Sequence, residues 1–226
     1  MSRKQDIPLI AIAGGSGSGK SWLARKLSDA DVTTICIDRF YLDRPHLSST
    51  RRAACNYDHP RAIDWNLLRQ TLEHARRGTR VEIPVYSFEQ HLRTGVARET
   101  PGRMIILEGL WALRNRAIAP LIDLGIFVDA DSKLRLERRL TRDVKERGRS
   151  RSSVLRQFRE QVEPMHKRFV EPQRRRADLI LQSPISSPDL KLLQYRIAEL
   201  RTGDPYAPEV LPTQSDHCLT ASPKPA

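Results

Sequence analysis

Cysteine is scarce in this 226-residue chain and has no pattern. The three cysteines, Cys36, Cys55 and Cys218, are scattered, odd in number and without the CxxC spacing of a zinc site. This pattern excludes a disulfide framework, and such sparse use of cysteine is typical of proteins in a reducing compartment. We therefore expect a cytoplasmic protein.

Long hydrophobic runs are also lacking. No apolar run approaches the ~20 residues that a membrane-spanning helix needs. Residues 1–4 and the apolar stretch after them resemble a secretory signal, but that stretch is short and leads into a glycine-rich loop rather than a cleavage site. The sequence thus predicts one α/β core with no membrane partner.

Acidic residues are too few to balance the basic ones, and the formal net charge is +12. Residues 133–176 alone hold 16 basic and 6 acidic residues. Such a block is typical of a region that contacts nucleic acid, an acidic membrane surface or a polyphosphate ligand. Composition leaves these three possibilities open.

A glycine-rich segment near the N-terminus fits the phosphate-loop pattern G-x-x-x-x-G-K-[ST]. It follows a predicted buried strand at residues 7–13, and a helical pattern begins at residue 22. Glycines let backbone N–H groups turn inward around phosphates, Lys20 would reach the β- and γ-phosphates, and Ser21 would bind Mg²⁺. The predicted nucleotide site comprises Gly14, Gly15, Ser16, Gly17, Ser18, Gly19, Lys20 and Ser21.

Two further apolar strands end in a carboxylate. Residues 32–37 lead into Asp38, and residues 103–107 lead into Glu108. Ligands of an open α/β sheet bind at the carboxyl ends of its strands. Either residue alone is explained equally well as a helix cap, but both together favour a shared site, with Asp38 as a base and Glu108 near the metal.

Between these strands the pattern predicts a helix at residues 65–77 and then a β-hairpin that leaves the sheet. The hairpin carries Tyr86 and His91. Taken by itself, a histidine on such a polar loop is most simply a solvated surface residue.

A basic helix with Asp131 or Ser132 as its N-cap is expected after a strand at residues 125–128. Its apolar residues at i, i+4 and i+8 predict a buried stripe, and its other faces are rich in arginine, which binds phosphate oxygens bidentately. A solvated basic helix is the ordinary alternative. The stripe consists of Leu136, Leu140 and Val144, and the arginines are Arg135, Arg138, Arg139 and Arg142.

The next predicted helix starts at Ser152 or Ser153 and is interrupted by Pro164. A fifth strand at residues 179–181 and a last helix from Pro188 complete the core. The apolar residues expected inside these two helices are Leu155, Phe158 and Val162 in the first, and Leu190, Leu193, Ile197 and Leu200 in the last.

Several separate motifs together resemble the uridine kinase family with its phosphoribulokinase-like relatives. The resemblance covers residues 7 to about 182 and rests on the order and spacing of the motifs. Besides the phosphate loop they are Asp38-Arg39-Phe40-Tyr41, Tyr57-Asp58-His59-Pro60, Pro84-Val85-Tyr86-Ser87-Phe88-Glu89-Gln90-His91-Leu92-Arg93, Glu108-Gly109, Arg142-Asp143, Glu146-Arg147-Gly148-Arg149, Val170-Glu171-Pro172 and Ala177-Asp178.

The resemblance implies a three-layer α/β P-loop NTPase fold, with a five-stranded parallel sheet flanked by helices. Residues 1–201 would form the kinase domain, in which about 79–100 is a nucleoside-binding hairpin and about 133–160 a basic helical lid. Residues 202–226 hold five prolines and no apolar periodicity, which predicts a disordered tail. The resemblance also implies ATP or GTP, Mg²⁺ and a homo-oligomer.

The implied reaction is phosphorylation of the 5′-hydroxyl of uridine or cytidine. Asp38 would accept the hydroxyl proton and, with Ser21 and Glu108, surround Mg²⁺. Arg142 and Arg147 would neutralise phosphate charge. The implied nucleoside contacts are Asp58 and Arg139 to the ribose, Tyr86, His91 and Arg149 to the pyrimidine edge, Tyr41 and Tyr57 as pocket walls, and Gln157 as a support. His91 is thereby reassigned from the surface to the ligand site.

Ser87 and Arg39 depart from residues common in the family, which leaves the acceptor less fixed than the reaction. One alternative is a kinase of another small hydroxyl compound, such as a sugar phosphate. Another is an RNA-binding NTPase whose basic region contacts backbone phosphates. Tyr86, His91 and Asp58 favour a small-molecule pocket over specific binding of nucleic acid.

Overall fold

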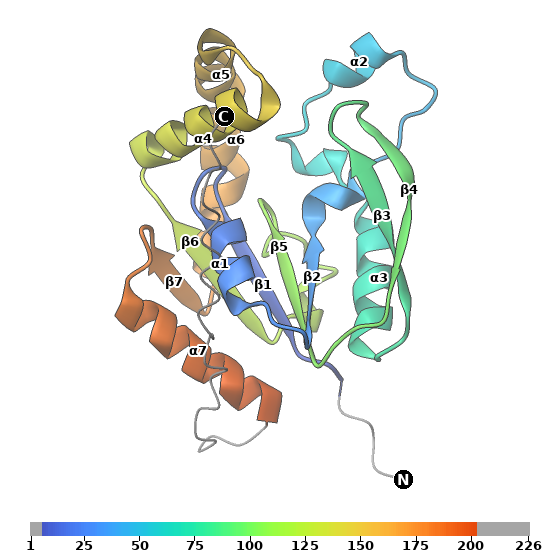
Figure 1. Cartoon of the computed structure of the whole chain (residues 1–226), viewed down its shortest axis with the longest axis vertical. Coiled ribbons are helices and arrows are strands. Elements are labelled where there is room, and N and C mark those ends of the chain that lie inside the picture. Colours follow the sequence, from blue (N-terminus) through green and yellow to red (C-terminus); the bar gives the residue numbers. More distant parts are fainter. Residues whose placement is uncertain (1–5, 203–226) are drawn as a thin grey trace, which may run out of the picture.

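The computed structural model describes residues 6–202, so the predicted tail beyond Thr202 lies outside the described residues. A five-stranded parallel sheet with strand order β2-β5-β1-β6-β7 forms the centre (Figure 1). This confirms the predicted sheet. Its strands are β1 (Leu9–Gly14), β2 (Val32–Cys36), β5 (Met104–Gly109), β6 (Leu124–Asp129) and β7 (Leu179–Gln182).

The central strands are apolar because both of their faces are covered. Every residue of β1 and β5 is buried. In the parallel register Ile10 lies between Ile106 and Leu124. Near-continuous apolar sequence of this kind is typical of a parallel sheet with helices on both sides.

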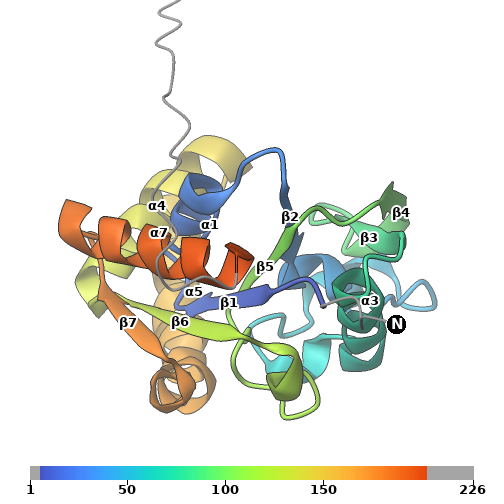
Figure 2. The same cartoon turned by 90° about the horizontal axis from the view of Figure 1, so that it is seen from below.

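Helices α1 (Lys20–Leu27) and α7 (Ser187–Thr202) cover one face of the sheet (Figure 2). Leu23 of α1 and Leu193 and Ile197 of α7 belong to a buried cluster with the sheet residues Ile10 and Ile126. Leu190 and Leu200 pack at its margin, so the predicted buried spacing of the last helix is confirmed. Within residues 6–202, none of the helices has the length and apolarity to cross a bilayer.

The other face is covered by α3 (Trp65–Arg76) and by the segments after β5 and before β7. Asp64 begins α3 by accepting a hydrogen bond from Leu67 N at 3.1 Å. Leu68 and Leu72 are fully buried in a cluster with Trp111. The predicted hairpin is present as the antiparallel pair β3 (Val81–Ser87) and β4 (Leu92–Glu99), and it lies beside α3 (Figure 1).

A short helix, α2 (Ser49–Ala53), was not predicted. None of its residues is buried, so it leaves no apolar periodicity in the sequence. Its start is set by Ser48, whose hydroxyl accepts a hydrogen bond from Arg51 N at 3.4 Å. Side-chain capping rather than burial therefore defines this helix.

The buried stripe predicted for helix α4 (Ser132–Arg147) is wrong. Asp131 caps the helix, but Leu136 is only partly buried and Val144 is 41% exposed. Only Leu140 of the predicted stripe is buried. The helix packs against the polar phosphate loop rather than a sheet face. The side chains that α4 buries against this loop are therefore polar. Among the α4 side chains that the structure describes, the buried ones apart from Leu140 are Arg135, Arg139 and Asp143.

Three predictions about the following helices are also corrected. Ser150, not Ser152 or Ser153, caps α5 (Arg151–Gln157) by accepting from Ser153 N at 3.3 Å. Pro164 does not end the helical run, which continues from α5 through residues 158–170. It lies in the three-residue segment α6 (Glu163–Met165), directly after a π-turn whose i→i+5 bonding already departs from the α-helical pattern that a proline disrupts. Wide π-turns at Phe158–Val162 and His166–Val170 flank α6. Phe158 and Val162 are buried as predicted, whereas Val154 replaces Leu155 inside.

Candidate active site

The phosphate loop joins β1 to α1 in a conformation that only small residues permit. Gly17 and Gly19 have φ values of 82° and 103°, in the left-handed region. A Cβ on Gly14 would lie 2.6 Å from the carbonyl oxygen of Val128. Ser18 is fully buried, and its Oγ has no hydrogen-bond partner among the described residues. The loop thus has the glycine-lined backbone expected of a phosphate cradle.

The two strand-end carboxylates lie on neighbouring strands. Glu108 pairs in register with Cys36 at the end of β2, and Asp38 follows in the 3₁₀ turn Ile37–Phe40. Burial, followed by the charges of Asp38 and Glu108, raises the pKa of the Cys36 thiol. Both carboxylates therefore lie within electrostatic range of one side chain.

This arrangement suits Mg²⁺. Ser21 Oγ donates to Glu108 Oε2 at 3.3 Å, next to the first turn of α1. No group of three His, Cys, Asp or Glu side chains among residues 6–202 forms a metal cluster. Magnesium in kinases takes only one or two carboxylates and completes its coordination with phosphate oxygens and water, so a hydroxyl and two carboxylates are residue types that fit such a site.

Aromatic side chains gather beside Asp38. The Tyr41 ring lies 5.0 Å from that of Tyr57 and 5.2 Å from that of Tyr86, and Tyr57 stacks on His91 at 4.7 Å. Tyr41 Oη donates to Asp38 Oδ1 at 3.5 Å and to the Tyr57 carbonyl oxygen at 3.2 Å. The four predicted aromatic contacts thus form one wall next to the candidate base.

Two arginines fix the hairpin to this wall. Arg93 Nε donates to the Tyr41 carbonyl oxygen at 3.1 Å, and Arg93 Nη2 pairs with Asp64 at 3.1 Å. Arg39 Nε donates to the Pro84 carbonyl oxygen at 2.7 Å. The unusual residue after Asp38 therefore contacts the hairpin backbone.

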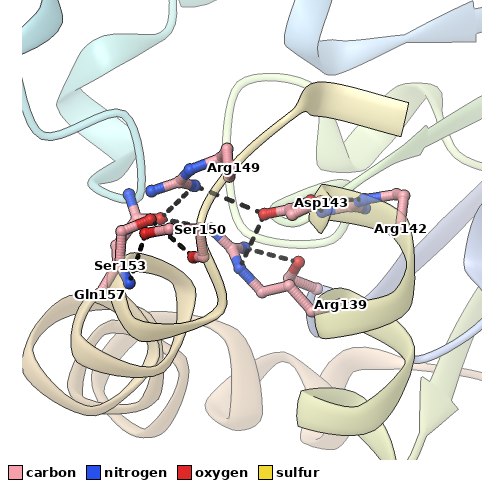
Figure 3. Close-up of polar contacts among 8 residues, drawn as sticks. Arg139, Arg142, Asp143, Arg149, Ser150, Ser153 and Gln157 are labelled. Atoms are coloured by element: carbon pink, nitrogen blue, oxygen red, sulfur yellow. Dashed lines mark hydrogen bonds and ion pairs between the residues drawn. The ribbon is translucent and has the colours of Figure 1, made fainter. Parts of the chain in front are cut away.

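A cluster of arginines surrounds Asp143, which is fully buried (Figure 3). Arg142 Nη2 lies 2.8 Å from Asp143 Oδ1, and Arg139 and Arg149 each lie 3.4 Å from Oδ2. Gln157 Oε1 accepts from Arg139 at 2.8 Å and from Arg149 at 2.7 Å. One carboxylate and one amide thus hold in place two guanidinium groups of α4 and one of its connection to α5.

This arginine cluster contacts the phosphate loop and lies within electrostatic range of Asp58, the residue predicted to bind the ribose. Arg139 Nη1 donates to Ser16 Oγ at 2.9 Å. Burial raises the pKa of Asp58, and the charges of Arg139 and Arg149 oppose that rise, so Asp58 lies within electrostatic range of both guanidinium groups. The structure therefore places Gln157 against Arg139 and Arg149, with Asp58 within electrostatic range of both arginines.

The prediction for Arg147 falls on a side chain outside the described part of the structure, although its backbone forms the last residue of α4. Lys20 is the first residue of α1 and is partly exposed at the end of the loop. The loop therefore presents Lys20 where its sequence pattern requires.

Sequence reasoning did not predict how several residues of α4 support the loop. Asp143 was noted only as part of a motif. Arg135 is 2% exposed and pairs with Glu163 at 2.7 Å, and Arg138 Nη1 donates to the Ser18 carbonyl oxygen at 3.2 Å. A signal was available, because Arg135, Arg139 and Asp143 follow the same i, i+4, i+8 spacing as the predicted stripe, shifted by one residue.

His166 lies beneath the loop, and its Nδ1 has no hydrogen-bond partner among the described residues. A Cβ on Gly15 would lie 2.9 Å from that nitrogen. Burial, and then the charge of Arg135, lower the pKa of His166 to about 4. His166 is therefore neutral at physiological pH and becomes protonated more readily in the unfolded chain.

This difference predicts a pH-dependent stability. Between the ordinary histidine pKa and about 4, the unfolded chain binds more protons, so the free energy of unfolding should fall as the pH falls through that window. Between pH 7 and pH 5 we expect a loss of about 2 kcal/mol from this residue. The loss is measured by urea unfolding of the wild type and of His166→Gln at pH 7 and at pH 5. Equal losses in the two proteins would contradict the assignment.

The fold and the loop define a nucleotide-binding P-loop kinase. Residues 9–187 match the model of the phosphoribulokinase / uridine kinase family, and the chain belongs to this family. It is thus a phosphotransferase that acts on an alcohol group and uses a nucleoside triphosphate.

Relatives and solved structures agree with this family. Uridine kinases of Staphylococcus aureus strains JH9 and Newman are 42% identical over 178 residues, 76% of this chain and 86% of theirs. A putative fructose transport system kinase from Silicibacter sp. TM1040 superimposes with a TM-score of 0.67 at 22% identity, over 80% of this chain and 92% of its own. Phosphoribulokinase from Rhodobacter spheroides superimposes with a TM-score of 0.53 at 18% identity, over 79% of this chain and 71% of its own. These two structures support the fold alone.

Proposed function

We propose that this protein transfers the γ-phosphoryl group of ATP or GTP to the 5′-hydroxyl of uridine or cytidine, giving UMP or CMP. The observation that carries the proposal is the 42% identity to uridine kinases over 178 residues. The aromatic wall beside Asp38 supports a flat base as part of the acceptor.

Asp38 would accept the proton of the 5′-hydroxyl. Its Oδ1 receives a hydrogen bond from Tyr41, which would fix the orientation of the carboxylate. Phosphoryl transfer needs alignment and charge stabilisation more than covalent chemistry from the protein. A base held at a strand end, next to the phosphate loop, meets that requirement.

The phosphates would be held by the loop N–H groups, Lys20, Arg142 and Arg147. Mg²⁺, when bound by Ser21, Glu108 and Asp38, would neutralise charge on the phosphate oxygens. Arg142 is one-third exposed and anchored by Asp143, so its guanidinium combines a fixed position with access to solvent. These features suit a lid arginine.

The nucleoside would lie between the hairpin and the arginine cluster. Asp58 and Arg139 would bind the ribose hydroxyls, with Gln157 holding Arg139 in place. Tyr86 and His91, with Arg149, would bind the pyrimidine edge. Tyr86 Oη is buried and makes no hydrogen bond within the described residues, which leaves it available to a ligand.

Variants of His91 and Asp58 separate recognition of the base from recognition of the ribose. His91→Ala should erode the preference for pyrimidines, whereas Asp58→Asn should lower kcat/KM for every riboside and weaken discrimination against deoxyuridine. A site built to hydrogen-bond its substrate rejects compounds that leave its polar groups unpaired by roughly 10⁴–10⁵-fold. The measurement is kcat/KM for uridine, cytidine, adenosine, deoxyuridine and ribulose 5-phosphate.

His74→Ala is a matched control, because His74 is exposed on α3 away from the hairpin wall. Preference of wild type for ribulose 5-phosphate, or equal use of adenosine and uridine, would overturn the pyrimidine assignment. ATP hydrolysis that only RNA stimulates would favour the RNA-binding NTPase instead.

Three further features stay proposals. They are a homo-oligomeric assembly, a cytoplasmic location, and the division into a kinase domain at residues 1–201 and a tail at 202–226.

A further inference from the structure

A second pocket, of about 350 Å³, lies apart from the predicted active-site residues. It is formed where the segment after β5 meets the start of α3 and the residues just before β7. No residue predicted for catalysis or substrate binding lines it. Its lining consists of Pro60, Trp65, Arg114, Asn115, Arg116 and Arg176.

Among the described residues, the three arginines of this pocket have no acidic partner. Arginines elsewhere form ion pairs, such as Arg135 with Glu163 at 2.7 Å and Arg201 with Asp29 at 2.9 Å. Within residues 6–202, no carboxylate lies within ion-pair distance of Arg114, Arg116 or Arg176. Like charges in one pocket repel, and a bound anion would relieve that repulsion.

Two of these guanidinium groups are held in place by neutral neighbours. Arg114 lies over the Phe169 ring, 4.8 Å from its centroid. Arg176 Nη1 donates to the Arg114 carbonyl oxygen at 2.6 Å. Burial, and then the charge of Arg176, lower the pKa of Arg114, so the two groups lie within electrostatic range of each other. The charges are therefore fixed before any ligand binds.

One wall of the pocket is rigid. Trp65 Nε1 donates to the Pro60 carbonyl oxygen at 2.9 Å, which fixes the indole at the start of α3. Pro60 is buried, and Trp65 packs on the face of the sheet that α3 covers.

We propose that this pocket binds a polyphosphate group, either free or carried by a nucleotide. Planar arginine forks bind phosphate oxygens bidentately, and three of them around one pocket suit several phosphates better than one. The volume lies in the range of small-ligand sites. A strand of RNA would instead need a groove with repeated stacking platforms, whereas the lining holds one aromatic residue, Trp65.

The test measures binding of tripolyphosphate by calorimetry in a Lys20→Ala background, which weakens binding at the phosphate loop. Adding Arg114→Gln and Arg116→Gln should raise the Kd about tenfold or more, because two charge-assisted contacts are lost. Arg80→Gln with Arg103→Gln is the matched control, since it removes the same charge from exposed positions outside the pocket. If the double variant unfolds, the same measurement is made with Arg116→Gln alone, because the Arg116 side chain is exposed.

The source of the phosphate is separated by titrating UTP in parallel. Tighter binding of UTP than of tripolyphosphate indicates a nucleotide, and equal binding indicates the free polyanion; both support the proposal. A Kd that changes no more in the pocket variant than in the control pair overturns it. Tighter binding of a 12-nucleotide RNA than of either ligand, lost in the pocket variant, also overturns it.

Discussion

Asp38→Asn is expected to lower kcat by roughly 10²–10⁴-fold, the usual contribution of a positioned base. The side chain lies in the turn after β2, is only partly buried and stands outside the hydrophobic core, so the fold should persist. Asparagine keeps an oxygen that accepts the Tyr41 hydroxyl but cannot take a proton. The measurement is kcat from steady-state kinetics with uridine and ATP. A thermal unfolding curve of each protein shows whether the fold persists.

A matched control lies at the other end of the same strand. Asp31 is an exposed carboxylate just before β2, and Asp31→Asn removes the same charge without touching the site. If Asp38→Asn kept the kcat of wild type with every acceptor tested, Asp38 would not be the base. Loss of activity in both variants would point to net charge instead.

The sheet and the ends of its strands were predictable because their signals are local. Each strand is an apolar run, and the runs that lead to the site end beside a glycine or a carboxylate. Parallel strands bring their carboxyl ends to one edge, so the sequence alone places Asp38 and Glu108 together. His91 needed the resemblance as well, because an isolated polar residue carries no pattern.

The orientation of α4 was not predictable from its apolar residues. The prediction assumed that a buried helix face is apolar, which holds when the helix packs on a sheet. Here the surface beneath it is the phosphate loop, which offers hydroxyl and carbonyl groups to Arg138 and Arg139. A rotation by one residue therefore exposes Val144 and buries Asp143. The arginine pocket was also beyond prediction, since its lining comes from three distant parts of the chain.

Asp143→Asn tests whether this buried carboxylate positions the lid arginines. Removing one partner of a buried ion pair leaves the other charges uncompensated and destabilises by about 3–5 kcal/mol. Arg139, Arg142 and Arg149 all lose their shared partner, although Gln157 still holds Arg139 and Arg149. Arg142 therefore becomes the least restrained, and the defect should appear in the catalytic step.

We expect Asp143→Asn to lower kcat by about tenfold or more with a smaller change in the KM for uridine, because a misplaced guanidinium weakens the transition state more than nucleoside binding. The Arg142→Ala variant should lose activity too, and the double variant should lose little more, since both act through one group. Asp123→Asn controls for stability, because it breaks the ion pair with Arg76 just before β6 and should leave kcat unchanged. Equal destabilisation by the two aspartate variants, with kcat retained in both, would reduce Asp143 to a structural ion pair.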